Sequence, residues 1–182
     1  MKKLLIGVII VFAAFLYITR DVERSVRDAR PIVQEQFVSI VGEARKRSTG
    51  AHDVLRDSIH RKRNTAICSL LESMEVADWT GEIEEIERKP GGRVEVKVRI
   101  GKSTFLVNRN TAIIFGDGAR NLIEMGSPVY EQVLNLEKYH TVRFSGRFFE
   151  DGVYCIKEVS QNLRNSLYMP EFIFRFVTIE KL

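Results

Sequence analysis

Histidine and cysteine are scarce in this chain, and their scarcity limits the chemistry open to it. Of 182 residues only 3 are histidine and 2 are cysteine. Two cysteines exclude a small fold held together by several disulfides and any zinc site made of four cysteines. The sequence also lacks a glycine-rich phosphate-binding loop, a serine-nucleophile motif and a pair of histidines at metal-binding spacing. We therefore expect a protein that is not an enzyme and has no cofactor.

The basic excess of the chain is confined to its N-terminal third. The formal net charge is +4, but residues 64–182 hold 15 Lys and Arg against 17 Asp and Glu. Residues 20–63 hold 11 against 7. A nucleic-acid-binding domain needs a basic footprint that faces the phosphates. Because the globular part is slightly acidic, we expect no nucleic acid partner for it.

The first 19 residues have the pattern of an export signal. Lys2 and Lys3 precede the uncharged run LLIGVIIVFAAFLYI, from Leu4 to Ile18. As a helix this run spans about 22 Å, at about 1.5 Å per residue. No Ala-x-Ala cleavage pattern follows it, so we interpret residues 1–19 as an uncleaved signal anchor and transmembrane helix. A cleaved signal peptide is the alternative.

The orientation of the anchor rests on the basic start of the chain. Arginines also follow the apolar run, so a strict count of positive charges on the two sides does not decide the topology. A short basic head is the usual start of an exported bacterial chain. We therefore expect a single-pass protein of the inner membrane, with the C-terminal domain in the periplasm.

Residues 20–63 are strongly charged and predict a helical linker. An amphipathic helix is expected from about Pro31 to Arg47, with proline in its first turn. The basic triplets 45–47 and 61–63 predict a solvated helix face, with contact to anionic lipid head groups as the alternative. His52 and His60 fall in this linker and are expected at the surface, as is His140.

Residues 64–182 predict a helix followed by a β-rich domain. Ile67, Leu70, Leu71 and Met74 have helical spacing, so a helix over about 65–76 is expected, with Asn64 or Thr65 as its cap. Strands are expected over 79–88, 94–100, 103–108, 141–149, 153–159 and 172–179, with a short helix from Ser127-Pro128 to about Leu136. Gly146 inside a strand predicts a bend or a close backbone approach.

Acidic residues crowd the first predicted strand, and they face basic residues on the second. We interpret them as cross-strand charge pairs rather than catalytic carboxylates. The acidic set is Glu82, Glu84, Glu85 and Glu87, and the basic set is Arg93, Lys97 and Arg99.

The order of these elements resembles the OB-fold, a small Greek-key barrel. The first strand is kinked, because Trp79, Gly81 and Ile83 share one parity while Ile86 has the other. A glycine lies in the fourth strand, and a helix separates the third strand from the fourth. The resemblance covers about residues 79–160 and implies a small antiparallel β-barrel with one extra C-terminal strand. A plain antiparallel sheet covered by a helix is the alternative.

The C-terminal third also looks like uncharacterised exported bacterial proteins. The residues that carry this likeness are Phe144-Ser145-Gly146, Phe148-Phe149, Cys155, Glu158, Ser160 and the run from Pro170 to Phe176. The likeness implies no activity and transfers no site residue.

Cys68 and Cys155 are expected to form a disulfide. Export to an oxidising compartment favours pairing, and an even number of cysteines leaves no odd thiol. Cys68 lies at the edge of the predicted helical stripe, and Cys155 lies on the face of its strand opposite Tyr154 and Ile156. A helix packed on that strand would bring the thiols together. Two separately buried free thiols are the alternative.

These patterns together predict an α+β protein of the bacterial envelope. A membrane-tethered, OB-like domain would act as a binding or assembly module for a protein, peptide or glycan, with a protein partner in the envelope. A nucleic-acid-binding OB protein is the alternative, and export, local charge and few outward aromatic residues all argue against it. The oligomeric state does not follow from the sequence.

Overall fold

The computed structural model describes residues 30–110, 121–160 and 162–182. The chain divides into two compact units, residues 1–30 and 31–182, and the fold described below is that of the second unit. The predicted anchor over residues 1–19 lies outside the described residues. Within the described ranges, no helix is both long enough and apolar enough to cross a membrane.

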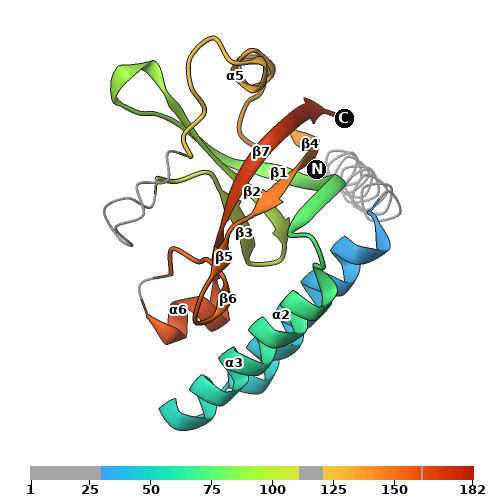
Figure 1. Ribbon diagram of the computed structural model, residues 1–182, viewed down its shortest axis with the longest axis vertical. Helices are drawn as coiled ribbons and strands as arrows, with labels where there is room; N and C mark the ends of the chain where they lie inside the picture. Colours follow the sequence, from blue (N-terminus) through green and yellow to red (C-terminus); the bar gives the residue numbers. More distant parts are fainter. Residues whose placement is uncertain (1–29, 111–120, 161) are drawn as a thin grey trace, which may run out of the picture. The chain divides into compact units, whose positions relative to one another are not determined.

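Five strands of the second unit close into a ring (Figure 1). Their order around the ring is β1-β2-β3-β7-β4; β3 and β7 run parallel, and the other neighbouring pairs are antiparallel. The strands are β1 (Glu75–Arg88), β2 (Val94–Gly101), β3 (Thr104–Val107), β4 (Thr141–Phe148) and β7 (Glu171–Lys181). The mixed α+β class predicted from the sequence is thereby confirmed.

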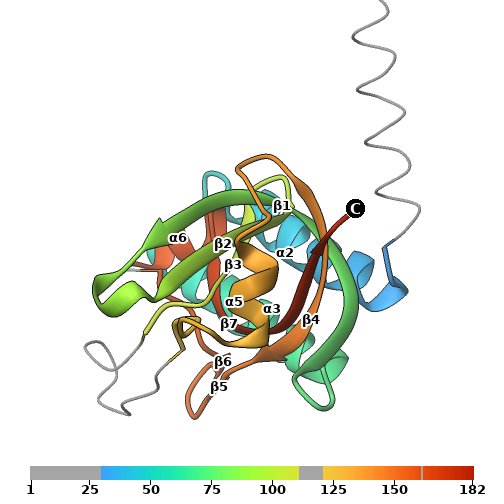
Figure 2. The same cartoon turned by 90° about the horizontal axis from the view of Figure 1, so that it is seen from above.

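Short elements connect and cover the ring strands. The 3-10 turn η1 (Pro90–Gly92) joins β1 to β2, and helix α5 (Pro128–Val133) lies between β3 and β4 in the sequence. Figure 2 shows α5 over the ring as seen from above. Ser127 caps α5, because its Oγ accepts a hydrogen bond from the Tyr130 N–H at 3.2 Å. Gln132 then ties α5 to β7 by accepting from the Ile179 N–H at 3.1 Å.

Two bends expected from the sequence allow the strands to curve. The register of β1 against β2 shifts between Ile83 and Glu85, which confirms the expected bulge. The register of β4 against β7 shifts between Ser145 and Gly146. A Cβ atom at position 146 would overlap the carbonyl oxygen of Arg175, so only glycine allows this close approach.

The last strand differs from its expected role. It was expected as an extra strand outside the barrel, but β7 closes the ring between β3 and β4. The segment 153–159, expected as the fifth strand, contains only β6 (Cys155–Ile156), which pairs with β5 (Glu150–Asp151). We attribute this difference to the apolar area that each segment buries. The segment 153–159 supplies only Ile156 to the core, whereas β7 supplies Phe172, Phe174, Phe176 and Ile179.

The region expected as a linker contributes to the core of the domain. Helix α2 (Ile32–Ser48) matches the predicted helix, yet it packs against the ring rather than standing apart. The Phe37 ring lies 5.3 Å from Trp79, 5.3 Å from Phe148 and 5.2 Å from Phe172, between ring centroids. Gln34 is fully buried, and its side chain accepts from the Thr80 N–H at 2.9 Å. The folded unit therefore begins at Pro31 and not at Asn64.

Helix α3 (Asp53–Leu70) begins twelve residues before the expected helix. His52 caps it by accepting from the Leu55 N–H at 3.4 Å. Asn64, the expected cap, lies inside the helix, and Met74 lies beyond its end. The sequence pattern missed the first half because the buried face there is polar, with His60, Arg63 and Asn64 between Ile59 and Ile67.

Candidate functional site

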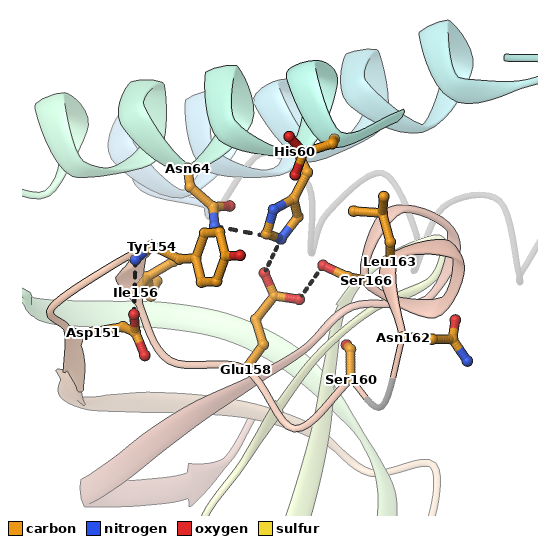
Figure 3. Close-up of a pocket in the computed structure, with 11 residues that line it drawn as sticks. His60, Asn64, Asp151, Tyr154, Ile156, Glu158, Ser160, Asn162, Leu163 and Ser166 are labelled. Carbon is orange, nitrogen blue, oxygen red and sulfur yellow. Dashed lines mark hydrogen bonds and ion pairs between the residues drawn. The ribbon is translucent and has the colours of Figure 1, made fainter. Parts of the chain in front are cut away.

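A pocket of about 300 Å³ lies where α3 meets the connection between β4 and β7. That connection, residues 149–170, holds β5, β6 and the short helix α6 (Leu163–Tyr168). Figure 3 shows the side chains that converge on the pocket from both sides. Its lining residues are Asp57, His60 and Asn64 from α3, and Asp151, Tyr154, Ile156, Glu158, Ser160, Asn162, Leu163 and Ser166 from the connection.

A buried ion pair forms the base of this site. The Arg63 side chain has no exposed surface, and that of Glu158 is 9% exposed. Arg63 donates from Nη2 to Glu158 Oε1. Its other donors go to the Ser166 carbonyl oxygen at 2.5 Å and to Asn64 Oδ1 at 2.8 Å. The guanidinium also lies over the Phe172 ring, 5.4 Å from its centroid, so the ion pair rests directly on the barrel core.

The surroundings of Glu158 favour its charged form. Burial raises the pKa of this carboxyl, but the hydrogen bond with His60, the charge of Arg63 and the hydrogen bond from Ser166 outweigh burial. Its pKa is therefore below the ordinary value for a glutamate. Burial lowers the pKa of Arg63, and Glu158 opposes that effect. An arginine remains charged in proteins, so the pair is ionic at neutral pH.

His60 lies between the ion pair and the aromatic wall of the pocket. Its Nε2 is 3.7 Å from Glu158 Oε1 and 3.5 Å from Asn64 Nδ2. The Tyr154 ring packs on the imidazole edge to face, with centroids 5.2 Å apart and planes inclined at 70°. The expectation that His60 lies at the surface is wrong, because only 9% of the residue is exposed.

Ser166 completes the cluster from α6. Its hydroxyl donates to Glu158 Oε2 at 2.7 Å. Asn162 caps the same helix by accepting from the Asn165 N–H at 2.9 Å. A hydrolytic triad needs histidine between serine and carboxylate, so that the histidine takes the serine proton. Here the carboxylate stands in the middle, and the arrangement positions Glu158 instead of activating Ser166.

Cys68 and Cys155 join the two sides of the pocket. They lie at disulfide-bonding distance, with Cα atoms 6.3 Å apart and a sequence separation of 87. Cys68 is on α3, two turns after His60 and one after Asn64, and Cys155 directly follows Tyr154. Cys155 has a φ of 70°, in the left-handed region, because the chain reverses direction there. Asp151 supports this reversal by accepting from the Val153 and Tyr154 N–H groups at 2.9 and 2.7 Å.

The outer surface of β1 and β2 carries the charge pairs expected from the sequence. Arg99 binds Glu82 and lies 3.4 Å from Glu84. Lys97 lies 4.0 Å from Glu85 and 2.8 Å from Glu171. The pairing of Glu82, Glu84 and Glu85 with cations of the neighbouring strand is confirmed. Arg93 differs from the expectation, because it donates to the Pro90 carbonyl oxygen at 3.1 Å.

The sequence predicted only part of this site. It named the two cysteines, but it placed the triplet 61–63 on a solvated face, and Arg63 is buried. Glu158 and Ser166 were missed as site residues, because neither a glutamate in a connecting segment nor a serine in a helix of six residues carries a local signal. One signal was available: His60, Arg63 and Asn64 share the helical face of Ile59 and Ile67. Polar residues on an apolar face predict buried partners elsewhere in the chain.

Neither a search for metal-ligand groups nor a comparison with known proteins assigns a function to this site. Among the described residues, no group of three or more His, Cys, Asp or Glu side chains is placed to hold a metal ion. Comparison with protein-family models, curated proteins and solved structures finds no match to this chain.

Proposed function

We propose that this chain is a membrane-tethered binding module whose ligand occupies the pocket between α3 and residues 149–170. The observation that carries the proposal is the pocket itself. Polar side chains from α3, from residues 151–162 and from α6 converge on one hollow beside an aromatic ring. Small-ligand sites likewise combine apolar walls with a few convergent polar groups. The buried pair of Arg63 and Glu158 holds two of these walls together. A preorganised pocket of this kind supports binding.

We assign the ring to the OB-fold as part of this proposal. Support comes from the strand order β1-β2-β3-β7-β4, the parallel pairing of β3 with β7, and α5 between β3 and β4. In this reading β7 is the fifth barrel strand. The loop between the fourth and fifth strands is one of those that contact ligands in OB-folds. Residues 149–170 form that loop here, and most of the pocket residues lie on it.

The membrane tether and the periplasmic location are supported by the N-terminal sequence and by the cysteine pair, and not by the pocket. The basic head and the apolar run from Leu4 to Ile18 favour insertion into the membrane. The placement of Cys68 and Cys155 at disulfide-bonding distance favours an oxidising compartment, because such bonds are rare in the cytosol. An inner-membrane protein with its domain in the periplasm accounts for both features.

The alternative of a nucleic-acid-binding OB protein has less support. Nucleic acids bind OB-folds on the face of the second and third strands. In this chain Lys97 and Arg99 of that face already pair with carboxylates of β1 and β7. Arg109, which follows β3, pairs with Glu95 at 2.7 Å. Cations held by carboxylates are poor partners for phosphates, so a nucleic acid is an outcome to be tested and not the proposal.

Two measurements test the proposed function. Alkaline phosphatase fused to the C-terminus should be active in intact cells, and the chain should resist carbonate extraction from membranes. A photo-reactive residue at Leu163, on the pocket wall, should capture a ligand that the same group at Leu134, an exposed position outside the pocket, does not. Equal labelling at the two positions would contradict a pocket ligand. An inactive phosphatase fusion would contradict the location.

A further inference from the structure

We infer that the ligand of this pocket is an uncharged sugar, an inference that rests on the binding function proposed above and names its ligand class. Three features of the pocket point to this class: its charges are already paired, its hydrogen-bonding groups match hydroxyl groups, and its size and aromatic wall match a sugar ring.

The charged groups of the pocket are engaged with protein partners. Glu158 pairs with Arg63, and Asp57 pairs with Arg61 at 2.9 Å. Asp151 accepts hydrogen bonds from two backbone N–H groups. The guanidinium of Arg63 donates from Nε and from both Nη atoms to protein acceptors, so it lacks the pair of outward donors that clamp a phosphate or carboxylate. Among the described residues that line the pocket there is no Lys or Arg, so an anionic ligand would meet carboxylates without a facing lysine or arginine.

The remaining polar groups include both hydrogen-bond donors and acceptors. Asn162 presents the N–H groups of its amide, because its Oδ1 already accepts from the Asn165 N–H. Ser160 and Tyr154 present hydroxyls, which both donate and accept, and His60 presents an imidazole. A sugar hydroxyl also donates and accepts at a single atom, so a ring that carries several hydroxyls can satisfy such a lining. A ligand with only donors or only acceptors would leave part of the lining unpaired, at a cost in affinity.

The apolar part of the pocket matches the C–H face of a sugar ring. Tyr154 is 40% exposed and is held by its contact with the His60 ring. Leu163 and Ile156 extend the apolar surface on the α6 and β6 sides. A volume of about 300 Å³ is at the small end of ligand pockets, which run from about 300 to 1,000 Å³. This space suits a ligand of one or two sugar rings.

A peptide is the less favoured ligand for the same domain. Extended peptides commonly bind by adding a strand to an open sheet edge. Every strand of the described ring has a neighbour on both sides, so the ring offers no such edge. A helical peptide needs a long apolar groove, and this pocket has a volume of only about 300 Å³.

The test uses the full chain in lipid nanodiscs and an array of oligosaccharides in three charge classes: neutral, amine-bearing and carboxylate-bearing. We expect binding to members of the neutral class. Tyr154→Ala should weaken that binding about tenfold or more, because it removes the ring on which the sugar packs. Tyr154→Phe should retain binding. Tyr139→Ala, at a tyrosine that is 66% exposed and outside the pocket, is the matched control and should change nothing.

The outcomes separate the sugar inference from the binding function. Binding confined to a charged class, or binding to no sugar on the array, overturns the sugar inference. If no sugar binds and the photo-reactive group at Leu163 still captures a peptide or a nucleic acid, the binding function stands with a different ligand. Sugar binding that survives Tyr154→Ala unchanged places the sugar elsewhere on the protein and overturns the inference for this pocket.

Discussion

Arg63 and Glu158, 95 residues apart in the sequence, form an ion pair that is shielded from solvent on the barrel core. The pair links α3 to the segment that follows β6, and Ser166 of α6 binds both partners. The ion pair therefore connects three parts of the pocket: α3, the segment that follows β6, and α6. Two buried charges are tolerated here because each compensates the other.

Removal of one partner of this pair should be costly. Arg63→Met leaves the Glu158 charge buried and uncompensated, and we expect a loss of about 3–5 kcal/mol in the free energy of unfolding. Arg63→Met combined with Glu158→Leu should recover most of that loss, because both charges are gone. Arg61→Met, which breaks the exposed pair with Asp57, is the control and should cost less than about 1 kcal/mol. Urea unfolding measures all three, and equal losses for Arg61→Met and Arg63→Met would contradict the assignment.

The lowered pKa of Glu158 should make stability depend on pH in acid. Because the folded pKa is below the unfolded value of about 4.3, the contribution is fully present above that value. It is lost as the pH falls through the folded pKa. The difference in unfolding free energy between the wild type and Glu158→Gln should therefore shrink as the pH falls below about 4.3.

The control for this pH dependence is Glu180→Gln. Glu180 is exposed and lies 3.7 Å from Arg143, so its charge is largely screened by water. The wild-type advantage over this variant should be small and nearly constant from pH 7 to pH 3. An advantage over Glu158→Gln that stays constant across the same range would argue against a lowered pKa at Glu158.

The cysteine pair should stabilise the domain in its oxidised form. A bond between Cys68 and Cys155 closes a loop with a sequence separation of 87, and the chain-entropy model gives about 4–5 kcal/mol for a loop of that size. Reduction of the wild type, and the double variant Cys68→Ser/Cys155→Ser, should lower the unfolding free energy to a similar value. Reductant should not affect the double variant. Thiol labelling of the denatured chain, trapped at lysis, should find no labelled cysteine before reduction, and two labelled cysteines would exclude the bond.

Two glycines should respond to alanine in opposite directions. Gly146→Ala places a Cβ against the Arg175 carbonyl oxygen and the Phe174 ring, and we expect a loss of about 1–3 kcal/mol or more. Gly42→Ala, in the middle of α2, meets no atom within 4 Å and should add about 0.5–1 kcal/mol by favouring the helix. Thermal unfolding of the two variants distinguishes a steric requirement at position 146 from a general sensitivity to alanine.

The sequence by itself determined the local elements whose buried faces are apolar. Alternation in β2, the bulge in β1, the glycine bend in β4 and the cap of α5 each depend on neighbouring residues, so a short window contains the whole signal. The cross-strand charge pairs of Arg99 and Lys97 were also predictable, since adjacent strands of a tight hairpin are close in sequence. The two cysteines were predicted to pair because their number is even and because export to an oxidising compartment favours a disulfide.

Only the tertiary structure decided which strand closes the ring and where the pocket lies. β7 pairs with both β3 and β4, contacts that join residues far apart in the chain and leave no periodic trace. The first half of α3 was not predicted for the same reason: its buried residues have partners that are distant in the sequence. Its buried face is polar because His60, Arg63 and Asn64 have Glu158 and Ser166 as partners, and those partners come from residues about a hundred positions later. A buried charge is tolerated only beside a compensating charge, and only the folded structure shows which residue supplies it.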